Sequence, residues 1–169
     1  MILIRNEEAA DYAAVYEVNR EAFGRCNEAD LVDVLRRVAD PQISLVATWE
    51  GEVVGHIFFS PVSIGEGDST TLALGLGPMA VDPDFQRRGV GSALVRAGLE
   101  ACRRAGHKIV VVIGHPNFYP RFGFVSARRR GLGCEYAVPD EVFMVAELEP
   151  NALAGVSGMV RYLPEFTEV

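Results

Sequence analysis

The sequence predicts an α+β protein built around a mixed, mostly antiparallel central sheet of about six to seven strands. Two observations support this fold class. Three consecutive β-rich segments between residues 43 and 81 follow two helical segments, and a later strand–helix–strand order makes two strands run parallel. The 169 residues, of which 49% are hydrophobic, suffice for one well-cored domain that covers residues 1–169.

Two helices are predicted near the N-terminus, after a short strand at residues 2–4. Residues 7–23 carry apolar side chains at helical spacing and acidic side chains early, as expected at the positive end of a helix dipole. The second helix is predicted to begin with Asn27 as its N-cap and to stop at Asp40-Pro41.

Three strands are predicted next, at residues 43–49, 53–64 and 70–81. The segments are rich in β-branched and aromatic residues and are joined by glycine-containing turns, which predicts an antiparallel meander. After this meander, residues 86–92 form a glycine-rich turn, and residues 93–105 are predicted to form a helix.

The continuous β-branched run at residues 108–113 is typical of a strand buried on both faces. Because a helix separates it from the strand that ends at Val81, we expect these two strands to be parallel. Two further strands are predicted at residues 124–127 and 142–148, with a polar loop between them. The tail beyond Pro150 is predicted to pack over the surface.

Cysteine spacing and hydropathy exclude several classes of protein. Cys26, Cys102 and Cys134 show neither a CxxC pattern nor Cys/His spacing, which argues against a disulfide framework and a metal site. No apolar run approaches the roughly 18 residues of a membrane span, and the N-terminal charges have the wrong order for a secretory signal. We therefore expect a cytoplasmic protein without a membrane partner.

The charge distribution is strongly asymmetric, although the net charge is only −7. Residues 86–130 carry ten basic side chains and one acidic side chain, which gives this stretch +9 against −16 for the rest. An acidic body argues against nucleic acid as a partner, whereas one basic stretch suits a small polyanionic ligand. The alternative is that these arginines, including those at residues 128–130, only solvate the surface.

The turn Gly89-Val90-Gly91-Ser92 has a direct use at the start of a helix. Unpaired backbone N–H groups and the helix dipole converge on an anion there, and glycines let a phosphate approach the backbone. The P-loop pattern GxxxxGK[ST] is absent, and the dinucleotide-binding pattern fails because Leu94 replaces its third glycine. The turn therefore predicts an anion site of another kind, with a purely structural turn as the alternative.

Two motifs resemble those of a known family. Val81-Asp82-Pro83-Asp84-Phe85-Gln86-Arg87-Arg88-Gly89-Val90-Gly91-Ser92-Ala93-Leu94 resembles the acetyl-CoA signature of the GNAT superfamily of N-acetyltransferases, whose core is Gln/Arg-x-x-Gly-x-Gly/Ala. Phe118-Tyr119-Pro120-Arg121-Phe122-Gly123-Phe124 is similar to its aromatic-Tyr-x-x-x-Gly-Phe motif. With the order of the elements, the resemblance covers residues 1–148. It implies an α/β/α layered fold, with helices on both faces of the sheet and a splay between the two parallel strands.

The resemblance also implies an acyltransferase that takes acetyl-CoA as co-substrate and uses no metal. The pantetheine arm would pair with the backbone of a strand as an added strand does, and the pyrophosphate would lie on the glycine turn. The implied cofactor-binding residues are Met79, Ala80, Val81, Gln86, Arg87, Arg88, Gly89, Val90, Gly91 and Ser92, with Asn117 as a further amide near the cofactor.

Tyr119 is the catalytic residue that the resemblance implies. The expelled CoA thiolate needs a proton or a hydrogen bond, and ordinary pKa values of about 8.5 for a thiol and about 10 for tyrosine are close enough for a phenol to supply it. The alternative is an aromatic side chain that packs with its phenylalanine neighbours. A backbone N–H near Met79 or Ala80 would stabilise the oxyanion.

The general base has no clear candidate. Several family members carry a glutamate on the strand before the signature, whereas residues 74–79 contain no acidic side chain. A water relay is therefore expected, ending at Glu21, Glu28, His56 or His115, each of which is alternatively a solvated or core residue. Gly75 and Gly77 on the same strand mark either a bulge or a close packing point.

The function expected from the resemblance is transfer of the acetyl group to a primary amine of a small molecule, protein or peptide, by direct attack in a ternary complex. The alternative is a non-catalytic acyl-CoA-binding module of the same fold. A nucleophilic Cys134 and a nucleotide-dependent dehydrogenase are disfavoured. Glu21, Glu28 and Asp30 would favour a cationic acceptor if they face the cleft, and exposed sheet edges favour a homodimer.

Overall fold

The computed structural model describes the backbone of residues 1–169 and all side chains except that of Glu168. The order of the predicted elements is confirmed: a strand, two helices, three consecutive strands, a helix and further strands, with additional short strands in the C-terminal part. The α-helices of the described chain are α1 (Tyr12–Phe23), α2 (Asn27–Val38) and α3 (Val90–Arg104). The strands are β1 (Ile2–Asn6), β2 (Ile43–Trp49), β3 (Glu52–Ile64), β4 (Thr71–Val81), β5 (Ile109–Ile113), β6 (Val125–Ser126), β7 (Leu132–Cys134), β8 (Phe143–Glu147) and β9 (Gly158–Arg161).

The strands form one mixed sheet, in the order β1-β2-β3-β4-β5-β8-β6. Neighbours along this path are antiparallel except β4 and β5, whose parallel register joins Leu74 to Val110 and Leu76 to Val112. The predicted parallel pair and the mostly antiparallel sheet are therefore confirmed.

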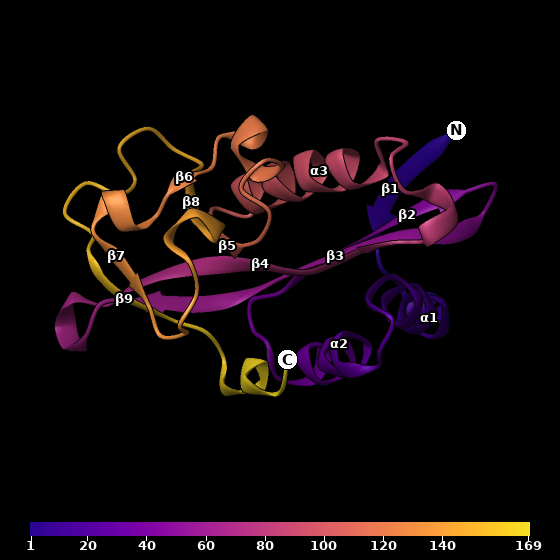
Figure 1. Cartoon of the computed structure of the whole chain (residues 1–169), viewed down its shortest axis with the longest axis horizontal. Coiled ribbons are helices and arrows are strands. Elements are labelled where there is room, and N and C mark those ends of the chain that lie inside the picture. Colours follow the sequence, from indigo (N-terminus) through magenta and orange to yellow (C-terminus); the bar gives the residue numbers. More distant parts are fainter.

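Helices cover both faces of the sheet, as the resemblance implied. In Figure 1, α3 lies on one face and α1 and α2 lie on the other. Successive residues of β3 explain how one strand serves both layers, because side chains alternate between the faces of a sheet. Ile57 and Phe59 pack with α3, whereas Phe58 packs with Val15 of α1 and Leu35 of α2.

Helix boundaries differ from the prediction where local hydrogen bonds compete with the apolar pattern. Residues Ala9–Asp11 form a 3-10 turn, in which the Asp11 carboxylate accepts from Glu8 N and pairs with Arg5, so α1 begins only at Tyr12. Asn27 is the first residue of α2 rather than its N-cap, which is Cys26.

Helix α3 also begins earlier than predicted. Gly89 has φ +83° and is the N-cap, so Val90, Gly91 and Ser92 belong to the first helical turn rather than to a loop. A left-handed residue at the cap changes the chain direction directly before the helix, which is why glycine occupies this position.

The C-terminal part differs most from the prediction. The polar loop contains β7, and the tail beyond Pro150 contributes β9, which pairs with the end of β3 and runs parallel to β7. Val160 on β9 is fully buried and Leu153 is nearly so. The tail is thus part of the sheet and core, and strands this short carry too little periodicity to be recognised in a sequence.

None of the described helices combines the length and apolar character needed to cross a bilayer.

A buried polar network lies between the sheet and the two N-terminal helices. Arg36 donates to both carboxylate oxygens of Glu7 (2.9 and 2.7 Å), Ser44 Oγ donates to Glu7 (2.9 Å), and His56 Nε2 lies 2.8 Å from Ser44 Oγ. His56 is fully buried, and burial lowers the pKa of its imidazole to about 4. The ring is therefore neutral at pH 7.

We expect the free energy of unfolding to fall as the pH drops from about 6.5 to about 4, partly because of His56. In this window the unfolded chain binds a proton on this imidazole that the folded chain does not, which costs up to about 1.4 kcal/mol per pH unit. Urea unfolding across this range should show a shallower pH dependence for His56→Gln. An unchanged slope would contradict the buried neutral imidazole.

Helix α3 approaches the sheet most closely at Gly98. A Cβ at this position would lie 2.5 Å from Cε1 of Phe59, whose ring is fully buried.

Gly98→Ala is therefore expected to lower the free energy of unfolding by about 1–2 kcal/mol. The overpacking penalty should exceed the gain in helix propensity of about 1 kcal/mol, because the enclosed Phe59 ring has no space into which to move. Urea unfolding measures the difference. A more stable Gly98→Ala protein would show that α3 can shift away from the sheet.

Candidate active site

The two parallel strands at the centre of the sheet separate after a short stretch of pairing. Their register covers only residues 74–76 of β4 and 110–112 of β5. Beyond Leu76, β4 continues to Val81 while it still pairs with β3 on its other side, for example Met79 with Ile57. In the described chain no strand pairs with the β5-facing edge of this segment, which is the splay that the resemblance implied.

A bulge in β4 coincides with the point of separation. Between the pairs Phe59–Leu76 and Ile57–Met79, β4 contains one residue more than β3. The extra residue falls at Gly77-Pro78, where Gly77 has φ +138° and proline lacks the N–H that a ladder needs. Bulges bend a strand and interrupt its pairing, so Gly77 accounts for the direction in which β4 leaves β5.

Gly75 has the other role that the sequence left open. A Cβ there would lie 2.9 Å from the ring of Tyr162, so the missing side chain lets this tyrosine pack directly on β4. Of the two glycines on this strand, one is a close packing point and the other marks the bulge.

A cavity of about 610 Å³ occupies the gap between the separated strands. Its central walls are residues 76–79 of β4 and residues 112–115, at and just after the end of β5. It reaches Phe118 and Tyr119, which pack in the core beneath α3, and also Leu31 and Phe166, which pack on the opposite side with Phe58. The cavity therefore connects the two faces of the sheet through the splay.

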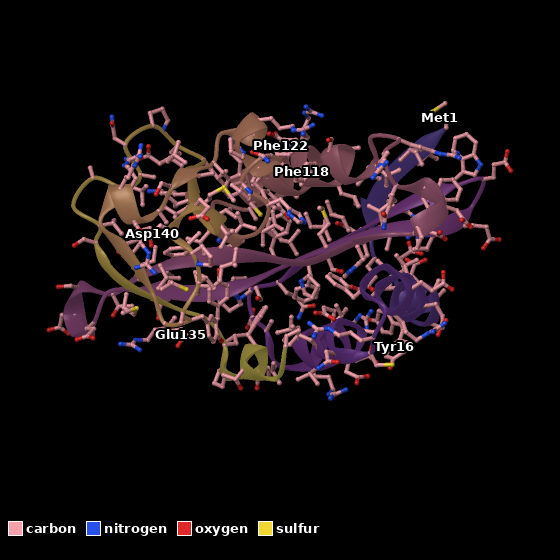
Figure 2. All side chains as sticks on the ribbon, in the orientation of Figure 1. Met1, Tyr16, Phe118, Phe122, Glu135 and Asp140 are labelled. Carbon is pink, nitrogen blue, oxygen red and sulfur yellow. The ribbon has the colours of Figure 1, made fainter. Side chains whose placement is uncertain are left out.

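The glycine turn and the aromatic segment lie together beside this cavity. A Cβ on Gly91 would lie within 3.7–3.8 Å of Met79, Phe118 and Val81. Phe118 and Phe122 make an edge-on contact with centroids 5.0 Å apart, and Figure 2 shows both near α3. Two motifs separated in sequence thus meet against one strand. Asn117 is exposed beside Phe118.

The start of α3 presents free donors. The first backbone hydrogen bond of this helix runs from Ala93 N to Gly89 O (3.0 Å). Within the described chain no carbonyl accepts a hydrogen bond from the N–H groups of Val90, Gly91 or Ser92. Arg87 itself adopts φ +64°, and both it and Arg88 are exposed. This arrangement can bind an anion through backbone N–H groups and the helix dipole.

Ion pairing divides the basic stretch into two groups. One group is neutralised: Arg103 and Arg104 pair with Glu100, Lys108 with Glu149, Arg128 with Asp140, and Arg130 with Glu147. Five basic residues of the stretch have no carboxylate partner within 4 Å among the described residues: Arg87, Arg88, Arg96, Arg121 and Arg129. The first four lie on the glycine turn, on α3 or in the aromatic segment, whereas Arg129 lies in the separate turn Arg128–Arg130. Arg96 stacks on Phe122 (5.1 Å) and Arg121 on Phe118 (5.0 Å). Four of the five unpaired arginines therefore lie on the glycine turn, on α3 or in the aromatic segment beside it.

Gln86 lies at the turn, but its side chain is already engaged. Its amide Nε2 donates to Val81 O over 3.0 Å. This bond ties the turn to the end of β4.

Tyr119 is held tightly by aromatic packing and glycine. Its ring contacts Phe118 and Phe124 edge-on, with centroids 5.0 and 5.6 Å apart, and a Cβ on Gly114 would lie 2.4 Å from it. The residue is only 6% exposed and lines the cavity, and no described side chain or backbone group bonds to its hydroxyl. Burial raises the pKa of Tyr119 to about 12, so the phenol stays protonated.

Two of the four candidate bases line the cavity and two do not. Glu21 is half exposed and does not line the cavity, and His56 belongs to the buried network described above. His115 is exposed and lines the cavity, and so does Glu28, which is only 6% exposed. Asp30, a candidate for acceptor binding, bonds instead to the Tyr16 hydroxyl (2.8 Å).

Part of the cavity wall has no counterpart in the sequence-based prediction. Tyr136, Val138, Tyr162 and Phe166 line the α2 side, although they follow the last motif. For Tyr162 and Phe166, the signal in the sequence was the presence of aromatic residues in a tail that looked irregular. Their position depends on β9, which carries the chain back across the sheet.

Other reactive side chains do not form a site. Cys102 and Cys134 are buried, and burial raises the pKa of both thiols, which makes them poor nucleophiles. Across the side chains described, no group of three or more His, Cys, Asp or Glu residues gathers as a metal site would require.

Comparison with known proteins gives concordant matches. A family model described as an acetyltransferase (GNAT) domain matches residues 3–127. The chain is 41% identical over 138 residues to the uncharacterized N-acetyltransferase YjhQ of Escherichia coli K12, covering 79% of this chain and 76% of that protein. It is 36% identical over 166 residues to the uncharacterized N-acetyltransferase YhbS of the same strain, covering 98% of both.

Solved structures similar to this chain are also GNAT acetyltransferases. The crystal structure of E. coli YhbS in complex with CoA has a TM-score of 0.90 at 35% identity, over 98% of this chain and 92% of that one. A GNAT acetyltransferase from Brucella melitensis in complex with acetyl-CoA has a TM-score of 0.79 at 34% identity, over 98% of both chains. With the splayed sheet, the glycine turn and these relatives, the chain belongs to the GNAT acetyltransferase family.

Proposed function

We propose that the protein transfers the acetyl group of acetyl-CoA to a primary amine by direct attack in a ternary complex. The observation that carries this proposal is the cavity through the splay, which extends from Tyr119 on one side to an aromatic wall on the α2 side. The glycine turn lies beside it, because Gly91 is close to the cavity-lining residues Met79 and Phe118. A cavity that extends to both sides of the sheet suits two substrates that react with each other. The related structures from E. coli and B. melitensis contain CoA and acetyl-CoA.

The residues beside the splay fit acetyl-CoA in its chemistry. The free edge of β4 at Met79, Ala80 and Val81 offers backbone groups to the two amides of the pantetheine arm. The N–H groups of Gly89, Val90, Gly91 and Ser92 suit the pyrophosphate, and the unpaired arginines Arg87, Arg88, Arg96 and Arg121 suit the remaining phosphate charge. Asn117 adds an exposed amide at the same place.

Tyr119 would act on the leaving group as a hydrogen-bond donor. With its pKa at about 12 and that of an ordinary thiol at about 8.5, full transfer of the phenolic proton to the thiolate is unfavourable. A neutral phenol next to the sulfur still stabilises the charge that develops as the C–S bond breaks. Burial thus shifts the role of Tyr119 from acid toward electrostatic stabilisation.

The amine side of the reaction uses groups on the opposite face. A backbone N–H of β4 near Met79 or Ala80 would receive the oxyanion. Of the four base candidates, Glu28 and His115 line the cavity and are therefore within reach of the acceptor or of a bridging water.

Gly89→Glu should abolish acetyl-CoA binding, measured by calorimetry, because a carboxylate would stand where the pyrophosphate binds. Gly106→Glu is the matched control, since Gly106 lies just beyond the other end of α3, also has positive φ (+91°) and also has no atom near its Cβ position. The control should lose stability to a similar degree but keep its Kd. Equal binding by both variants would refute the anion site.

Tyr119→Phe should lower kcat by about a hundredfold while the Kd for acetyl-CoA changes by less than about twofold. Gly114→Ala should lower kcat by at least about tenfold, because its methyl group would displace the Tyr119 ring. Gly133→Ala, whose Cβ would make ordinary 3.5 Å contacts, is the control. Thiol release measures turnover, and an unchanged kcat in Tyr119→Phe would remove this residue from the reaction.

A further inference from the structure

The α2 side of the cavity has an aromatic wall formed by Tyr136, Tyr162 and Phe166. The ring centroids lie 5.8 Å apart for Tyr136 and Tyr162 and 5.3 Å apart for Tyr162 and Phe166. Tyr162 packs on Gly75 of β4, and Phe166 packs against the core below α2. The wall is therefore anchored to the sheet and to a helix, and it gives this end of the cavity an apolar surface.

Two polar atoms in this wall lack a partner. The hydroxyls of Tyr136 and Tyr162 are buried, and within the described part of the chain no group hydrogen-bonds to either. Buried hydroxyls almost always have a partner, because an unpaired one costs about 1–3 kcal/mol. Both residues line the cavity, which makes their unpaired hydroxyls candidates for hydrogen bonds to a bound molecule.

The cavity wall contains one buried carboxylate, that of Glu28. Arg25 Nε donates to Glu28 Oε1 (2.9 Å), and Arg25 Nη2 bonds to the other oxygen. Each oxygen keeps a lone pair after this bidentate contact, and the pair as a whole is neutral. The site can therefore receive one amine group, but it lacks the excess negative charge that a polycation would require.

Resting on the proposed function, we propose that the acceptor is a small primary amine with a compact apolar body and one hydrogen-bonding group at its far end. Glu28 receives the amine, the aromatic wall contacts the body, and the hydroxyls of Tyr136 and Tyr162 bind the far group. A cavity of about 610 Å³ that also admits the end of the pantetheine arm suits a small acceptor group.

The reaction balances with the groups present. The ammonium first loses a proton through Glu28 to solvent, and the free nitrogen then attacks the thioester carbonyl carbon. The C–N bond forms and the C–S bond breaks, with the electron pair left on sulfur beside the Tyr119 hydroxyl. The second proton lost by nitrogen ends on the thiolate, so the products are the amide and CoA.

The test compares tyramine, phenethylamine and spermidine as acceptors of the full chain with saturating acetyl-CoA. Tyramine and phenethylamine differ only in the far hydroxyl, and spermidine replaces the apolar body with further charges. We expect kcat/KM for tyramine to exceed that for phenethylamine by about tenfold or more, because a site built to hydrogen-bond a hydroxyl rejects its absence. Spermidine should be the poorest of the three.

Matched variants assign this preference to the named residues. Tyr162→Phe removes one hydroxyl and should reduce the ratio of kcat/KM for tyramine to that for phenethylamine by about tenfold. Tyr136→Phe provides the same measurement if the first variant does not fold. Glu28→Gln should lower kcat/KM at least about tenfold for both aromatic amines. The controls Tyr12→Phe and Glu17→Gln, which alter a tyrosine and an Arg-paired glutamate away from the cavity, should change neither rate.

The two proposals fail differently. If acetyl-CoA binds and spermidine or a peptide amine is acetylated faster than tyramine, the acceptor class is wrong and the acetyltransferase proposal stands. The same holds if Tyr162→Phe and Tyr136→Phe both leave the tyramine preference intact. If acetyl-CoA binds and no amine is acetylated, or if acetyl-CoA does not bind, the proposed function itself fails and the acceptor class fails with it.

Discussion

The separation of β4 from β5 is the constraint on which the rest of the site depends. A sheet with every strand paired would have no central opening, because backbone hydrogen bonds hold neighbouring strands about 4.8 Å apart. Here the pairing covers only residues 74–76 and 110–112, and the bulge at Gly77-Pro78 then turns β4 away. The helices on both faces keep the sheet folded despite this loss of pairing, since each face has its own buried core.

The opening gives the two faces of the sheet different chemical character. Around the start of α3, free backbone donors and unpaired arginines produce a positively charged rim, although the whole chain carries −7. On the α2 side, Glu28 is neutralised by Arg25 and the wall is aromatic. A highly charged substrate on one face and a small amine on the other would therefore be separated by electrostatics as well as by geometry.

The packing that holds Tyr119 also defines what its hydroxyl can do. Phe118, Phe124 and the bare backbone of Gly114 enclose the ring, which fixes its position and raises its pKa at the same time. The aromatic-packing role and the proposed catalytic role, which the sequence set against each other, are thus compatible. Tight packing makes the phenol a weaker acid and a better positioned hydrogen-bond donor.

Much of the fold followed from the sequence because its signals are local. The helical spacing of apolar residues, the β-branched runs and Gly89 before α3 act within a few residues, and the strand–helix–strand order implied the parallel pair. The motif resemblance, which also depends on residues close in sequence, predicted site roles for the turn and Tyr119. Errors occurred where competing local hydrogen bonds displaced a boundary, as at Asp11, or where strands were too short to show a period, as at β7 and β9.

The sequence by itself determined the order of all elements except the short strands β7 and β9, the glycine turn before α3 and the motifs typical of the family. Only the tertiary structure decided which arginines remain unpaired, which of the four candidate bases reach the cavity, and that Tyr136 and Tyr162 form its far wall. These properties depend on contacts between residues far apart in the chain, such as Tyr162 against Gly75. Spacing along the sequence does not encode such contacts, because they arise only when the sheet brings β9 back beside β3.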